Sequence, residues 1–165
     1  MRLELEARAV FNSVISLQET NKTHSRRVAG LYGFAAFVSL IGLADSIYLT
    51  VEHLSGRSVR CTIVAGCSEV LSSSYASLSG VPLALIGAIA YFTVFSLATL
   101  AAFDYKWAGR FLTIVVGVMF LVTLWLLYLQ AFVIRAFCQF CLLSALVTTI
   151  LTVLVIAARR QNPKN

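Results

Sequence analysis

The chain has 165 residues, of which 59% are hydrophobic and only 12% are charged, and its mean hydropathy is +0.88. Soluble domains carry roughly 25% charged residues, so this composition excludes a soluble protein and indicates one membrane domain. The formal net charge of +6 does not indicate nucleic-acid binding, because the basic residues gather at the ends of long apolar runs.

The first segment, residues 1–27, differs from the rest of the chain in its pattern. Between residues 2 and 19, apolar residues recur at helical spacing and charged residues lie among them. We therefore expect a cytoplasmic amphipathic helix on the membrane surface. A helix that packs on the end of the bundle is the alternative. The interleaved charges argue against a cleaved signal peptide.

Four apolar runs follow, each long enough to cross a hydrocarbon core of about 30 Å at about 1.5 Å per residue. The predicted fold is an all-α, four-helix transmembrane bundle over residues 28–158, with a non-cytoplasmic loop at 52–80 and a cytoplasmic tail at 159–165. Short connectors make the later spans antiparallel neighbours. The expected spans are residues 28–51, 81–103, 111–134 and 136–158.

One carboxylate interrupts the first span. Asp45 lies about two turns before the end of that span, where a charge facing lipid would cost on the order of 3 kcal/mol. We expect Asp45 to face the bundle interior or an aqueous pocket, where it could handle protons or bind a cofactor. A carboxylate that is simply hydrogen-bonded to neighbouring helices is the alternative.

The distribution of Lys and Arg orients the bundle. Ten of the 13 basic residues fall on the side of the two termini, and the remaining three are Arg57, Arg60 and Arg135. The positive-inside rule therefore predicts cytoplasmic termini. All four cysteines then lie on the non-cytoplasmic side, where disulfides form.

The four cysteines form two pairs. Cys61 and Cys67 lie in the polar loop, and Cys138 and Cys141 lie three residues apart at the start of the last span, on one face of a helix. The helix dipole would favour a Cys138 thiolate. Thiol–disulfide exchange needs an attacking thiolate, a disulfide and a second thiol. Cys141, one turn deeper, could meet a lipid-soluble two-electron carrier such as a quinone.

Other readings of the cysteines remain open. Two static disulfides could fix the loop, and free thiols are ordinary in membrane bundles. Four thiolates could bind a metal, but no His lies beside either pair, so we expect no metal site. The aromatic residues Tyr91, Phe137 and Phe140 are further candidates for the wall of a quinone pocket.

These motifs, taken together and in this order, resemble the vitamin K epoxide reductase family in its bacterial form, without a fused thioredoxin-like domain. The resemblance covers roughly residues 28–158. Ser144-Ala145-Leu146 replaces a Thr-Tyr-Ala segment of the animal enzymes, so coumarin sensitivity is not implied. The motifs are Ala44-Asp45-Ser46-Ile47-Tyr48-Leu49-Thr50, Cys61-x5-Cys67-Ser68-Glu69-Val70-Leu71-Ser72-Ser73, Gly80-Val81-Pro82 with Gly87 and Tyr91, and Cys138-x2-Cys141.

The resemblance implies a role for each matching residue. Cys138 and Cys141 match the active-site pair, with Cys141 nearest the quinone. Cys61 and Cys67 match the loop pair, which passes electrons from a soluble thioredoxin-like protein to the active site. Ser73 matches a loop hydroxyl that can hydrogen-bond a quinone oxygen, a contact that would stabilise developing charge.

The predicted function is therefore that of a membrane thiol oxidoreductase that promotes disulfide formation and passes electrons to a quinone of the ubiquinone or menaquinone type. Its expected partners are a separate thioredoxin-like dithiol protein, the quinone and the lipid bilayer. The expected location is a bacterial inner membrane with periplasmic cysteines, and the endoplasmic reticulum is the alternative. The rival functions are a quinone or vitamin K epoxide reductase and a non-enzymatic subunit with structural disulfides.

Overall fold

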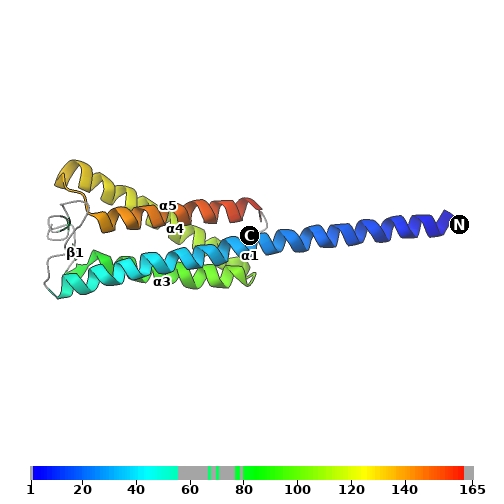
Figure 1. The fold of residues 1–165 in the computed structure, drawn as a ribbon, viewed down its shortest axis with the longest axis horizontal. Coiled ribbons are helices and arrows are strands. Elements are labelled where there is room, and N and C mark those ends of the chain that lie inside the picture. Colours follow the sequence, from blue (N-terminus) through cyan, green and yellow to red (C-terminus); the bar gives the residue numbers. More distant parts are fainter. Residues whose placement is uncertain (1, 56–66, 68–69, 71–76, 79, 162–165) are drawn as a thin grey trace.

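The computed structural model describes residues 2–55, 67, 70, 77–78 and 80–161. The described chain is all-helical apart from one short hairpin (Figure 1). Four of its helices are long and apolar enough to cross a membrane, which confirms the predicted fold class. The elements are α1 (Arg2–Leu54), β1 (Ser77–Leu78), β2 (Val81–Pro82), α3 (Leu83–Ala102), α4 (Lys106–Tyr128), the π-helix η1 (Leu129–Ile134) and α5 (Gln139–Gln161).

Helix α1 unites two segments that the sequence suggested were separate. The expected amphipathic segment is helical, but it continues into the first span without a break. Figure 1 shows the beginning of α1 projecting beyond the other helices, so this part does not pack on the end of the bundle. Its location on a membrane surface stays a prediction.

The hairpin β1–β2 leads the loop into α3. Ser77 pairs with Pro82 and Leu78 pairs with Val81 in antiparallel register. Gly80, in the turn, has a φ of 86°, a conformation that glycine adopts without steric cost. Pro82 then directly precedes α3, where its missing N–H removes no helical hydrogen bond.

The connector between α3 and α4 is shorter than the hydropathy pattern suggested, and the connector before α5 is longer. The link between α3 and α4 ends at Tyr105, so α4 already begins at Lys106. At the other end, the helix that begins as α4 continues through η1 to Ile134. Residues 136–138 are not helical although they were expected in the last span, and α5 begins at Gln139.

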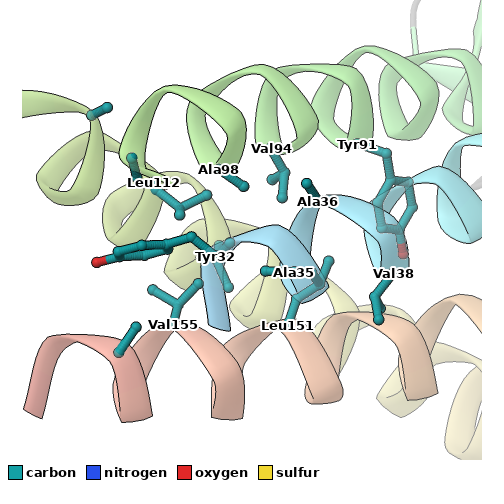
Figure 2. Close-up of a cluster of buried hydrophobic side chains, with 14 of the residues drawn as sticks. Tyr32, Ala35, Ala36, Val38, Tyr91, Val94, Ala98, Leu112, Leu151 and Val155 are labelled. Atoms are coloured by element: carbon teal, nitrogen blue, oxygen red, sulfur yellow. The ribbon is translucent and has the colours of Figure 1, made fainter. Parts of the chain in front are cut away.

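The main core fills the half of the bundle that contains Val28 of α1 and Ala158 near the end of α5. Figure 2 shows small and branched side chains of α1, including Ala35 and Val38, between those of α3 and α5. Helix α4 completes the bundle by packing against α3 and α5. Large apolar side chains elsewhere on the helices point outward, as lipid contact requires. A second, smaller buried cluster lies around the cysteines.

Candidate active site

Cys138 occupies the position just before α5. Its carbonyl oxygen accepts a hydrogen bond from the Leu142 N–H at 3.0 Å, which is the first turn of the helix. The sequence expectation that Cys138 lies at a helix start therefore agrees with the structure. However, the two cysteines are not both inside the helix, because the chain becomes helical only at Gln139.

The surroundings of Cys138 favour its thiolate. The Cys141 thiol donates a hydrogen bond to the Cys138 sulfur, and this contact is the main cause that lowers the pKa of the Cys138 thiol to about 7. Burial opposes the shift, and the backbone N–H groups of Cys141 and Phe140 reinforce it. Cys138 is 0% exposed. It is therefore a buried sulfur that is substantially ionised near neutral pH, as an attacking group requires.

Gln130 contacts the same residue from η1. Its Oε1 accepts a hydrogen bond from the Cys138 N–H at 3.1 Å, and the Gln130 side chain is only 3% exposed. The sequence analysis missed Gln130. A signal was present, because an uncharged polar side chain inside a membrane helix needs a hydrogen-bond partner.

The loop cysteine that the structure describes lies close to this group. Cys67 is 2% exposed and shares a buried cluster with Leu49, Val70, Ala136 and Cys138. Cys67 is disulfide-bonded, whereas Cys138 and Cys141 are free thiols, so neither of these is the partner of Cys67. Cys61 and Ser73 lie outside the described residues.

A pocket of about 150 Å³ lies beside the small cluster, between all four long helices. Two of the predicted site residues, Asp45 and Cys141, line it, whereas Cys138 and Cys67 lie in the adjoining cluster. The wall is mostly apolar. The other lining residues are Ser46, Leu49, His53, Val70, Pro82, Leu83, Ala84, Gly87, Thr123, Leu126, Leu127, Leu129, Gln130, Ile134, Ser144 and Ala145.

Asp45 faces the inside of the bundle, as expected for a carboxylate in a span. It is 7% exposed, and its Oδ2 has no hydrogen-bond partner. The expected alternative, a carboxylate satisfied by neighbouring helices, does not describe this oxygen. His53 lies two turns further along α1 and lines the same pocket. The pocket therefore has titratable side chains as well as a thiol.

Comparison of the sequence with known protein families identifies the family of this chain. The sequence matches the vitamin K epoxide reductase family over residues 34–156, which is more than half of the chain. The chain belongs to the vitamin K epoxide reductase family. The matched range contains the four cysteines, Asp45, Gln130 and the pocket. Membership implies a membrane thiol oxidoreductase that uses a quinone.

The pocket fits the ring of the quinone that the vitamin K epoxide reductase family uses. An apolar cavity of about 150 Å³ is large enough to hold a benzene-sized ring. The unpartnered Asp45 Oδ2 is a polar group available to a bound molecule, and Cys141 supplies a sulfur in the same wall. Asp45, Cys141 and the apolar side chains around them would hold the ring.

The aromatic candidates have other places in this member of the vitamin K epoxide reductase family. Tyr91, Phe137 and Phe140 are not among the described lining residues. The Tyr91 hydroxyl lies 2.8 Å from Ser144 Oγ and 2.9 Å from Thr148 Oγ1 and therefore links α3 to α5. Phe140 packs against Tyr48, with ring centroids 5.4 Å apart. These rings support the helices around the pocket.

Proposed function

We propose that the protein takes two electrons from a soluble thioredoxin-like dithiol protein and passes them through Cys61/Cys67 and then Cys138/Cys141 to a ubiquinone- or menaquinone-type quinone. The net result is disulfide formation in exported proteins. The observation that carries this proposal is the position of the two free thiols. Cys138 lies in the cluster that contains Cys67, and Cys141 lines the adjoining pocket.

The exchange between the two pairs is balanced in bonds and electrons. The Cys67 thiolate attacks the Cys138 sulfur of a Cys138–Cys141 disulfide, and Cys141 leaves as a thiolate. The Cys61 thiolate then attacks Cys67 and releases Cys138. The loop pair is oxidised and the active-site pair is reduced. A bonded Cys67 beside free Cys138 and Cys141 is the state that this exchange would leave.

The charge distribution supports a location in a bacterial inner membrane. With ten basic residues on the side of the termini and three on the other, we place both termini in the cytoplasm and the cysteines in the periplasm. Thiols on that side meet exported proteins. We place Ser73 near the quinone oxygen on the family resemblance alone.

The test of this function mixes the purified protein, without oxygen, with a reduced thioredoxin-like protein and a short-chain quinone. We expect one quinone reduced for each partner disulfide formed, because each couple transfers two electrons. Protein whose free thiols have been alkylated under denaturing conditions should have no activity, and it sets the background. Partner oxidation without quinone loss would contradict the proposal, and so would efficient turnover of a quinone epoxide in place of the quinone.

We further propose that Asp45 supplies a proton in the last step. A quinone accepts two protons with its two electrons, and a pair that consists of a Cys138 thiolate and a Cys141 thiol carries only one. Asp45 is the buried carboxyl of the same pocket, and an isolated charge there would be costly, which favours its neutral form until it is needed. His53 lines the same pocket, two turns further along α1.

Asp45→Asn is therefore expected to slow quinone reduction about 100- to 10,000-fold, the scale of a lost general acid. The Asn side chain keeps the size of Asp45, so quinone affinity should change little. The measurement is single-turnover reduction at saturating quinone over a range of pH. Asp104→Asn, in the connector at the opposite end, is the matched control. An Asp45→Asn protein with the rate and pH profile of the natural protein would remove Asp45 from the mechanism.

A further inference from the structure

Gln130 and Cys138 are joined across a break in helical structure. The six residues of η1 form a π-helix, and Arg135 ends it in a left-handed conformation with a φ of 55°. The chain then reaches Cys138 in an irregular segment. The hydrogen bond from the Cys138 N–H to Gln130 Oε1 spans this whole segment. This bond holds the backbone of Cys138, the last residue before α5.

The π-helical form of η1 bears on the position of this side chain. π-Helical turns are rare and are frequently found at functional sites. Gln130 is the second residue of η1 and one of its two buried residues. The Gln130 side chain is buried and accepts a hydrogen bond from a backbone N–H. In the low dielectric of the protein interior such a hydrogen bond is strong.

We propose that Gln130 is a positioning residue, whose side-chain oxygen holds the backbone of Cys138 so that the Cys138 sulfur faces the first N–H groups of α5 and the Cys141 thiol. This inference rests on the proposed function, because the position of Cys138 matters only if its thiol takes part in the exchange. Without the acceptor, the residue before α5 can rotate. Its sulfur would then lose contacts that stabilise the thiolate.

The other groups that act on the Cys138 sulfur can be named. Cys141 of α5 donates to it, and a charge on Asp45 of α1, if present, would oppose its ionisation. Cys67 is disulfide-bonded and does not titrate. The described part of η1 contains no ionisable side chain. A change in Cys138 ionisation after substitution of Gln130 would therefore reflect position, because the substitution removes no charge.

The experiment titrates the ultraviolet absorbance of the thiolate in protein with its Cys67 disulfide intact, below the pH range in which tyrosines ionise. Gln130→Met keeps the shape of the side chain and removes the acceptor oxygen. Gln130→Asn keeps an amide that is one methylene too short for the observed bond. For both variants we expect the midpoint to rise by about one pH unit, which lowers the thiolate fraction at pH 7 about fivefold. Thr113→Val on α4 is the matched control.

The titration needs neither quinone nor a protein partner, so its outcome is separate from that of the proposed function. A raised midpoint in either folded variant, with no change in Thr113→Val, supports positioning by Gln130. A midpoint equal to that of the natural protein, or a lower one, in every variant that folds would overturn the proposal, even if thermal stability fell. Reduced stability alone would be a structural effect.

Discussion

Replacement of Cys141 by Ser is expected to stop quinone reduction and to allow a disulfide between Cys138 and the loop to form. The hydroxyl cannot form the Cys138–Cys141 disulfide, so quinone reduction should fall by about three orders of magnitude or more, as removal of a covalent nucleophile does. Cys138 keeps a disulfide within reach, because it shares a buried cluster with the bonded Cys67. Attack of the Cys138 thiolate on Cys67 would form a Cys67–Cys138 disulfide and release the Cys61 thiolate, which can reverse the step, so we expect this disulfide in a fraction of the molecules.

Peptide mapping by mass spectrometry under non-reducing conditions measures this product, and the rate of quinone loss measures the reaction. Cys138→Ala is the matched variant, because it should also abolish quinone reduction but leave the original Cys67 disulfide in place. If Cys141→Ser reduced quinone at the normal rate, Cys141 would not be the sulfur that meets the acceptor. A product in which Cys138 joins Cys61 would reverse the roles of the two loop cysteines.

The second large effect is expected at Gly42, where α1 meets α3. A Cβ atom at this position would overlap the ring of Tyr91. The Tyr91 ring cannot easily move away, because it is fully buried and its hydroxyl is bonded to α5 through Ser144 and Thr148. We expect Gly42→Ala to lower the free energy of unfolding by about 1–3 kcal/mol, the usual cost of overpacking.

Thermal unfolding in a mild detergent tests this expectation. Gly33→Ala is the matched control, because Gly33 is also in α1 but nothing lies within 4 Å of its added Cβ. Since alanine is the better helix former, Gly33→Ala should be neutral or stabilising by up to about 1 kcal/mol. Equal unfolding temperatures for the two variants would show that the contact between Gly42 and Tyr91 does not limit how closely α1 and α3 pack.

Hydropathy alone could predict the helices because the membrane imposes one simple requirement. Each span must hide its backbone polar groups in hydrogen bonds within the helix and present apolar side chains to lipid, and both demands leave long apolar runs. The inward position of Asp45 followed from the cost of a charge in lipid. The placement of the cysteine pairs at one end followed from the number of spans between them.

Hydropathy could not show where one regular helix changes into another structure. The end of α4, the π-helix η1 and the irregular residues before α5 all lie in an apolar stretch with no proline or glycine between Leu129 and Cys138. What ends the helical structure there is tertiary, including the bond from Gln130 to the Cys138 N–H. Likewise, nothing in an apolar pattern shows whether a tyrosine such as Tyr91 lines a pocket or ties two helices together.

The state of the sulfurs has a consequence for how the protein stores its electrons. Cys67 is in a disulfide, whereas Cys138 and Cys141 are free thiols, so among the described cysteines these two thiols hold two electrons that can be transferred. The two thiols lie at the pocket, because Cys141 lines its wall. In the proposed scheme, the loop pair would then be oxidised and could take those electrons back only by the reverse exchange. The active-site thiols would keep the electrons until a quinone arrived from the membrane, with no soluble partner bound.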